Sequence, residues 1–136
     1  MSTLTAKYKD HYVLFLEAGF IAVNQADEIS ATRLFAAARM LNPKSVLNDI
    51  GMGYLHLNKL EIKKAISYFE SALKIEPNNE MAKAFLGMAK VFSTDQVKEG
   101  HHILETLKES KDPAMKTFSK SSLEFVDKFM KKPVSQ

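Results

Sequence analysis

Four histidines are the side chains most able to bind a metal or transfer a proton: His11, His56, His101 and His102. His101 and His102 are adjacent, so in a helix they point to different sides and do not easily bind one ion. Glu105 follows His101 by four residues, a spacing that favours an ion pair on a helix surface. The chain has no cysteine that would complete a zinc site. We therefore predict no metal and no cofactor.

Other catalytic patterns are also missing from the sequence. Gly51-Met52-Gly53 is not followed by the lysine of a phosphate-binding loop, and we assign these glycines to helix packing. No serine, histidine and aspartate have a local spacing that suggests a catalytic triad, and there is no cysteine nucleophile. A small basic cluster near the end suits a helix terminus, where the dipole favours positive charge; it comprises Lys128, Lys131 and Lys132. The sequence thus predicts that the protein is not an enzyme.

The composition is typical of one soluble domain covering residues 1–136. Apolar residues make up 46% of the chain, enough for a single core. The 19 basic and 16 acidic residues are too balanced to favour nucleic acid as a partner. The most apolar stretch, Tyr12 to Val23, contains Glu17 and is shorter than the roughly 20 residues of a membrane span, so we expect no stable membrane insertion. No signal-peptide pattern is present, and we expect a cytoplasmic protein.

The sequence contains an internal repeat with a period of 34 residues. The spacing relates Gly19 to Gly53 and Gly87, Ala31 to Ala65, Phe35 to Phe69, Ala38 to Ala72, and Pro43 to Pro77. These residue types suit a helix–turn–helix unit, because small residues let two helices approach, an aromatic ring fills the space between them, and proline ends the second helix. We predict an all-α fold with three such repeats, at about 12–45, 46–79 and 80–113.

Polar residues at the predicted helix starts are candidate caps. The candidates are Ala26 or Asp27 in the first repeat, Asn58 with Glu61 in the second, and Asn78 or Asn79 in the third. Before the first repeat, Met1 to His11 reads as a polar lead-in, and the first long helix is expected to begin at Tyr8 or Tyr12.

The third repeat departs from the pattern. Glu99 replaces the small residue, Ile103 replaces the aromatic one, and the closing proline, Pro113, comes two residues late. A last helix is predicted at about 114–130, where it could cover the exposed edge of the third repeat, and Lys131 to Gln136 is a polar tail.

The pattern resembles the tetratricopeptide repeat (TPR). The resemblance implies a right-handed superhelical solenoid in which the first helices line a concave groove, with the last helix as a C-terminal cap. It also implies that the second, fifth, ninth and twelfth positions of each repeat point into the groove. Counted from Tyr12, Val46 and Glu80, the predicted partner-binding residues are Val13, Leu16, Phe20, Val23, Leu47, Ile50, Tyr54, Leu57, Met81, Ala84, Met88 and Val91.

All twelve side chains are apolar or aromatic, which predicts an interaction surface for an apolar-faced helix or an extended peptide. Two alternatives remain: the chain's own N-terminal segment or last helix fills the groove, or a homodimer buries it. Charged residues at the fourth and eleventh positions fit the frame poorly, so either the first helices are rotated or these side chains reach outward. They are Asp49, His56, Lys83 and Lys90. The groove lacks the basic and amide side chains of repeats that clamp acidic chaperone tails.

A short array of three repeats with an apolar groove resembles the TPR chaperones of bacterial type III secretion. One group holds needle subunits (the YscG and PscG kind), usually with a small helical co-chaperone, and another holds translocators (the SycD and LcrH kind). The short lead before the first repeat slightly favours the needle kind. The resemblance implies a protein partner, a secreted needle or translocator subunit, which is kept from assembling prematurely. The alternative is a general TPR adaptor or scaffold for protein–protein interaction.

Overall fold

The computed structural model describes residues 3–130, with side chains described for residues 6–128. In this range the chain is helical and contains no strand, which confirms the predicted all-α class. The elements in chain order are α1 (Thr3–Tyr8), η1 (Lys9–His11), α2 (Tyr12–Asn24), α3 (Glu28–Leu41), α4 (Leu47–Asn58), α5 (Ile62–Ile75), α6 (Glu80–Val91), α7 (Val97–Thr106), η2 (Leu107–Glu109), α8 (Pro113–Phe125) and a π-helical turn, η3 (Val126–Met130). The predicted polar tail, with Lys131 and Lys132, lies outside the described residues.

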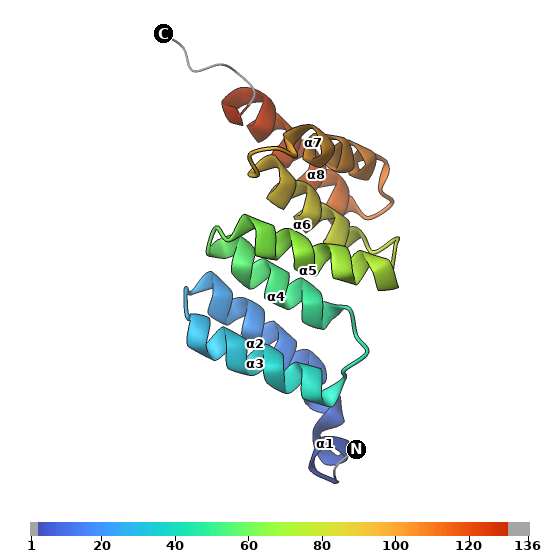
Figure 1. Cartoon of the computed structure of the whole chain (residues 1–136). Helices are drawn as coiled ribbons and strands as arrows, with labels where there is room; N and C mark the ends of the chain where they lie inside the picture. Colours follow the sequence, from blue (N-terminus) through green and yellow to red (C-terminus); the bar gives the residue numbers. More distant parts are fainter. Residues whose placement is uncertain (1–2, 131–136) are drawn as a thin grey trace.

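Six of the described helices form antiparallel pairs that stack one above another: α2 with α3, α4 with α5, and α6 with α7 (Figure 1). The first helix of each pair also contacts the next first helix, and α6 contacts α8 in the same way. As a result α2, α4, α6 and α8 follow one another along one side of the stack. The second helices α3, α5 and α7 lie on the other side.

Glycines allow the two helices of a pair to approach closely. A Cβ atom added to Gly53 would lie 2.4 Å from Cε1 of Phe69, and one added to Gly19 would lie 2.5 Å from Cε1 of Phe35. Both phenylalanines are fully buried, so each ring fills the space above a glycine of its own pair, as the spacing predicted. Gly51 lies against the Phe35 ring as well, which joins the first pair to the second.

The third pair keeps this arrangement with a shift of one residue. Gly100, rather than Glu99, is the buried small residue, and a Cβ there would lie 2.7 Å from the carbonyl oxygen of Gly87. Leu104, rather than Ile103, is the fully buried side chain over Gly87. The predicted register of the third repeat was therefore wrong by one position, because the connection from α6 to α7 is longer than the turns in the first two pairs.

The short turns and helix starts have specific local causes. Ala26 and Leu60, which are 34 residues apart, both adopt left-handed backbone conformations, with φ of 59° and 62°. Side chains of Asp27 and Asn79 accept hydrogen bonds from backbone N–H groups in the first turns of α3 and α6, which confirms these two predicted caps. The predicted cap at Asn58 was wrong, because Asn58 is the last residue of α4.

Shared core clusters connect neighbouring pairs. Leu55 of α4 belongs to the cluster of the first pair, and Ala82, Leu86 and Ala89 of α6 belong to that of the second. At the C-terminal end, α8 packs its buried face against α6 and α7. Burial of a leucine side chain stabilises a fold by about 1.5–3 kcal/mol, so Leu55 and Leu86 help to hold the pairs in place.

Candidate protein-binding face

Aromatic side chains from four helices form a continuous row on the side of the stack built by α2, α4, α6 and α8. Phe20 and Tyr54 have ring centroids 5.2 Å apart, and Tyr54 and Phe85 are also 5.2 Å apart. The ring centroids of Phe85 and Phe118 are 6.5 Å apart, with the two rings nearly perpendicular. All four side chains are half-buried, so each ring presents part of its surface. We call these four residues the aromatic row.

Two aromatic rings of the hydrophobic core contact the row and fix its position. The Phe35 ring lies 5.4 Å from Phe20, and the Phe69 ring lies 5.7 Å from Phe85. Because Phe35 and Phe69 are fully buried against glycines, Phe20 and Phe85 of the row rest on neighbours that have little room to move. The row is therefore a rigid apolar surface, of the kind that binds a partner with little loss of side-chain entropy.

Hydrogen bonds orient Tyr54 in the middle of the row. Its hydroxyl donates to Oδ1 of Asn24 at 2.5 Å, and Nδ2 of Asn58 donates to its backbone carbonyl oxygen at 2.8 Å. These bonds satisfy the polar atoms of Tyr54 and leave its ring for apolar contact.

A pocket of about 420 Å³ opens beside the row. Its walls are apolar or aromatic except for one asparagine: Tyr54, Leu57, Asn58, Leu60, Phe85, Met88, Phe92 and Phe118. Leu60 is 74% exposed at its rim although its backbone is left-handed, a conformation that leucine rarely adopts. An apolar side chain of a partner would fit this pocket.

The twelve predicted groove residues divide into three groups. Five are half-buried at or near the row: Phe20, Leu47, Tyr54, Leu57 and Met88. Two are exposed: Val13 and Met81. The other five are buried in the core: Leu16, Val23, Ile50, Ala84 and Val91. The expectation that all twelve line an open surface was wrong for this last group, because these side chains point at neighbouring helices.

Two residues of the row were not among those predicted. Phe85 occupies the position next to Ala84, and Phe118 belongs to α8, outside the repeats. The available signal was a large aromatic residue in the first helix of the third repeat, whose predicted groove positions carry none, and another in the last helix, for which no groove position was predicted. Phe92 and Leu60 of the pocket lie in connections just after the helices and were also outside the frame.

Two of the charged residues that fit the predicted frame poorly, Asp49 and Lys90, pair with residues of second helices. Asp49 accepts a hydrogen bond from Arg39 of α3 at 2.9 Å. Nζ of Lys90, a buried residue, lies 2.9 Å from Glu99 of α7. For Asp49 and Lys90 these partners account for the buried-side position, so neither predicted explanation, helix rotation or outward projection, is needed for these two residues.

The His56 side chain stacks flat on Tyr68 of α5, and its Nδ1 lies 2.8 Å from Oε1 of Glu61. The hydrogen bond from His56, together with that from Lys59, lowers the pKa of Glu61 from 4.5 to about 2. This cluster fixes the turn between α4 and α5, which carries Leu60. Since Leu60 lines the pocket beside the row, the cluster lies next to one rim of that pocket.

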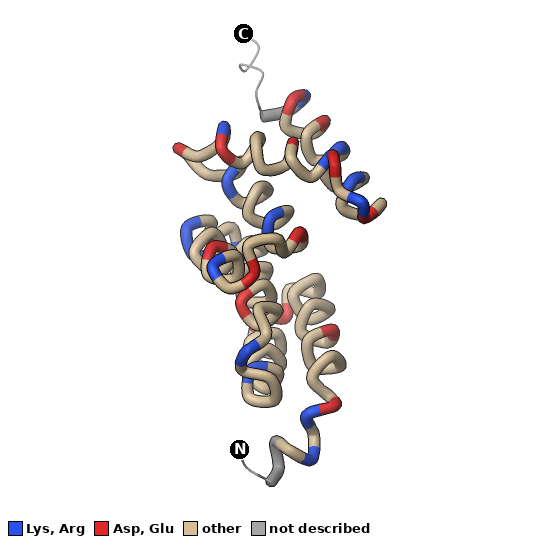
Figure 2. The backbone as a smooth tube through the Cα atoms, turned by 90° about the vertical axis from the view of Figure 1, so that its right-hand side faces the viewer, with Lys and Arg blue, Asp and Glu red and all other residues tan. Residues whose placement is uncertain are grey.

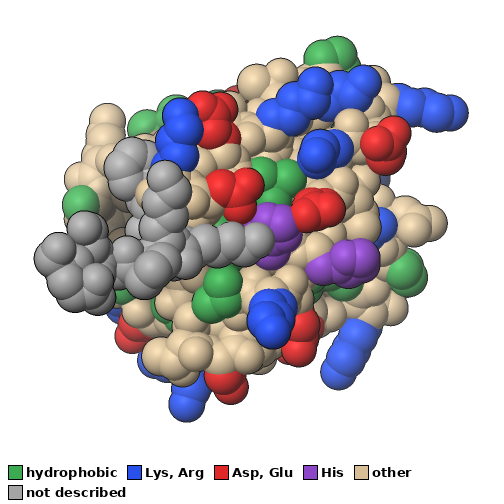
Figure 3. Space-filling view, turned by 90° about the horizontal axis from the view of Figure 1, so that it is seen from above, with side chains coloured by type: hydrophobic (Ala, Val, Ile, Leu, Met, Phe, Trp, Pro, Cys, Tyr) green, Lys and Arg blue, Asp and Glu red, His purple; other side chains and the backbone are tan. Residues whose placement is uncertain are grey.

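His101 makes the predicted contact along α7, with Nδ1 3.0 Å from Glu105, and its Nε2 lies 3.4 Å from Asp127. Among residues 3–130, no group of three or more histidine, aspartate or glutamate side chains is placed to hold a metal ion. Seen from the C-terminal end, the visible surface mixes acidic, basic and histidine side chains (Figure 3).

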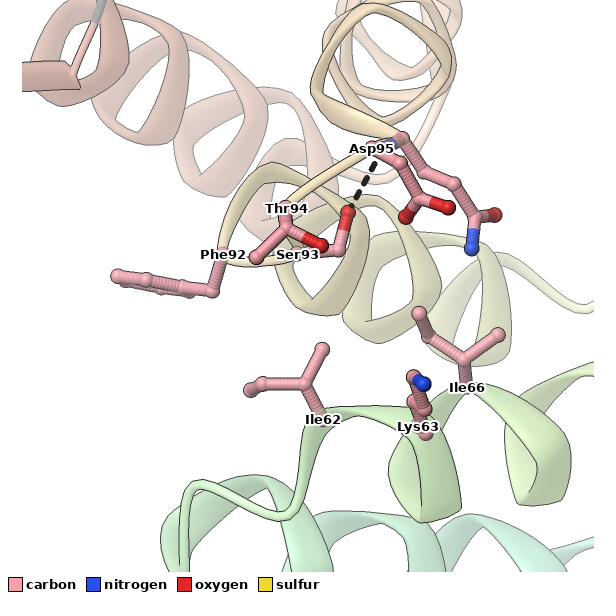
Figure 4. A pocket seen from close by; sticks show the side chains of 8 residues that line it. Ile62, Lys63, Ile66, Phe92, Ser93, Thr94 and Asp95 are labelled. Carbon is pink, nitrogen blue, oxygen red and sulfur yellow. Dashed lines mark hydrogen bonds between the residues drawn. The ribbon is translucent and has the colours of Figure 1, made fainter.

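A second pocket of about 350 Å³ lies between the start of α5 and the connection from α6 to α7 (Figure 4). Ile62 and Ile66 form its floor, and Ser93 in the connection accepts a hydrogen bond from the backbone N–H of Gln96 at 2.9 Å. Phe92 borders both this pocket and the one beside the row. The polar groups of this pocket stabilise the connection itself.

No family model, curated protein or solved structure matches the chain significantly. Within the described part of the chain, no helix has the length and apolar character needed to cross a membrane.

Proposed function

We propose that the protein is a TPR protein that acts by binding another protein, without catalysis. Two features with 34-residue spacing support the repeat: the glycines against the second helices, and the left-handed turn residues Ala26 and Leu60. The stacking of the helix pairs in chain order supports a superhelical solenoid, because each pair buries its apolar face on the next.

The aromatic row is the observation that carries the binding function. Apolar rings that stay partly exposed along several helices usually mark an interaction site. The fitting ligand is the apolar face of a helix, or an extended segment, laid across α2, α4, α6 and α8 with one side chain in the adjacent pocket. Such a contact buries on the order of 800 Å² per partner, with aromatic residues as the strongest contributors.

The proposed role is that of a cytoplasmic type III secretion chaperone. This step is based on the resemblance of a short TPR array with an apolar binding face to the needle and translocator chaperones. The row would cover the apolar face of a secreted subunit until export, either alone or with a small helical co-chaperone. A general adaptor would use the same face for a partner that is not exported, so the identity of the partner separates the two roles.

The test is to purify the tagged protein from its native cell, identify what is bound to it and measure the mass of the complex by light scattering. The proposal expects each copy of the chain to hold one small helical subunit that a secretion system exports, with or without a small helical co-chaperone. A partner that is not secreted would support the adaptor instead.

A matched pair of variants shows whether the row is the binding surface. Leu60→Asp places a carboxylate at the rim of the apolar pocket, where losing its water is costly. Aspartate adopts a left-handed backbone more readily than leucine, so the fold should be retained. We expect at least a roughly tenfold loss of affinity, whereas Ile75→Asp, at an exposed site at the end of α5, leaves affinity unchanged. Equal capture by both variants would refute the assignment of the face.

A further inference from the structure

Two neighbouring junctions between helix pairs differ in the side chains that line them. At the junction of the first and second pairs, a pocket of about 240 Å³ lies against the turn that follows α4. Nζ of Lys59 in that turn lies 2.6 Å from Oε1 of Glu28 at the start of α3, and Asn58 lines the same pocket. An ion pair therefore spans this junction, next to an amide side chain.

The next junction carries apolar residues at equivalent positions. Moving 34 residues along the chain takes Glu28 to Ile62, Asn58 to Phe92 and Lys59 to Ser93. Isoleucine and serine cannot form an ion pair, and the pocket between the second and third pairs is larger, at about 350 Å³. Its floor is apolar, because Ile62 and Ile66 point from α5 toward the connection between α6 and α7 (Figure 4). We call this recess the junction pocket.

Hydrogen bonds hold the connection that forms one wall of the junction pocket. Oγ of Ser93 donates to the backbone carbonyl oxygen of Lys90 at 2.6 Å and accepts from the backbone N–H of Gln96 at 2.9 Å. On the opposite wall, Ile66 is buried in the core cluster of the second pair. Because both walls are held by the fold, little entropy is lost when a side chain enters the pocket.

The junction pocket adjoins the pocket beside the aromatic row. Phe92, which is 41% exposed, lines both pockets. On the other wall, Leu60 lines the pocket beside the row, and Ile62, two residues further on, lines the junction pocket. A segment bound at the row therefore reaches the junction pocket by passing a single aromatic ring.

We propose that the junction pocket is a second subsite for the partner bound at the aromatic row, an inference that rests on the proposed binding function. Its ligand is a second apolar side chain of the same partner segment. Acidic and basic residues occur together along the stack (Figure 2), and Lys63 and Asp95 bring one charge of each sign to this pocket. Neither forms an ion pair with another residue in the described part of the chain. The partner segment thus carries two apolar anchors, the second of them flanked by charged residues that pair with Lys63 and Asp95.

Photo-crosslinking locates the partner at both pockets. A benzophenone amino acid would replace Leu60 or Thr94, an exposed residue that lines the junction pocket. The partner is the protein that co-purifies with the tagged chain, and mass spectrometry of the digested complex identifies the crosslinked residues. We expect both probes to crosslink to one segment of the partner.

The outcomes of this experiment separate the two proposals. If the probe at position 60 crosslinks to the partner while the probe at position 94 crosslinks to nothing, or to a second copy of the chain, the subsite is overturned and the proposed function stands. If neither probe crosslinks to the partner, the proposed binding face fails together with the subsite.

A synthetic peptide of the crosslinked segment measures the contribution of the junction pocket. Ile62→Glu places there the residue type that the first pair carries at the equivalent position, and the start of a helix favours negative charge, so the fold should be retained. Fluorescence anisotropy should show at least a roughly tenfold loss of affinity, because the second anchor loses its apolar site. Ile75→Glu, at a site that is 63% exposed, should bind the peptide as the wild type does.

A double-variant cycle shows whether the second anchor and the junction pocket act on each other. Replacing that anchor by alanine should weaken binding to the wild type at least about tenfold, and binding to Ile62→Glu less than about twofold. Equal losses with both proteins would overturn the subsite, since the anchor would then bind elsewhere. A loss of affinity in Leu60→Asp with none in Ile62→Glu would also overturn it, while leaving the proposed function in place.

Discussion

The contact between Gly53 and Phe69 predicts an unusual response to a small substitution. Replacing glycine by alanine inside a helix normally stabilises it by about 1 kcal/mol. In Gly53→Ala, however, the new methyl group would lie 2.4 Å from Cε1 and 2.8 Å from Cζ of the Phe69 ring. The ring is fully buried and lies 5.7 Å from Phe85, so it cannot move without displacing the aromatic row.

Overpacking of this kind costs about 3 kcal/mol at the upper end of its usual range. After the gain in helix propensity, Gly53→Ala should lower the free energy of unfolding by about 2 kcal/mol. For a chain of this size the midpoint of thermal unfolding should fall by roughly 8 °C.

Gly87→Ala is the matched control in the third pair. There the new methyl group would lie 3.0 Å from Cγ of Leu104 and 3.2 Å from Cγ2 of Ile103. These flexible side chains can move by a few tenths of an ångström, so the gain and the cost should cancel to within about 0.5 kcal/mol. Urea unfolding followed by circular dichroism measures both variants. Equal effects of the two substitutions would refute the argument that a rigid ring over Gly53 sets the approach of α4 and α5.

Three further substitutions test local features of the fold. Ala26→Gly should raise the free energy of unfolding by about 0.5 kcal/mol, because relief of the left-handed backbone exceeds the entropy cost of glycine; a destabilised variant in urea unfolding would contradict this. Asn79→Ala should lower it by about 1 kcal/mol through loss of the α6 cap, and an unchanged urea midpoint would count against that role. The pKa of Glu61 is lowered in the folded protein by His56 and Lys59, so its contribution is present above pH 4.5 and is lost as the pH falls toward about 2. As the pH is lowered from 4.5 to about 2, the thermal unfolding midpoint of Glu61→Gln should therefore fall less than that of the wild type. Equal falls of the two midpoints over this pH range would exclude the effect.

The sequence predicted the packing of the first two helix pairs because it depends on residue size at fixed spacing. Glycine opposite phenylalanine recurs after 34 residues, and Gly19 with Phe35 and Gly53 with Phe69 form the expected contacts. The caps at Asp27 and Asn79 were predictable for a similar reason, since each is a local interaction within four residues.

The third pair and the binding face were harder to predict. Extra residues in the connection from α6 to α7 shift the register, and the glycine at Gly100 can be recognised only once the connection is known. Position numbers in a repeat do not give the tilt of a helix against its neighbours, which decides that Ile50 is buried and Phe85 is half-exposed. Phe118 joins the row through the packing of α8 on α6, a contact that no periodicity in the chain specifies.

Site-specific photo-crosslinking to the captured partner tests the central claim most directly. A benzophenone amino acid would replace Leu60, at the pocket beside the aromatic row, or Met40, which is exposed on the α3 side of the stack next to Tyr68. If the aromatic row binds the partner, the probe at position 60 crosslinks to it and the probe at position 40 does not. Crosslinking from position 40 with none from position 60 would show that the partner binds the other side of the stack.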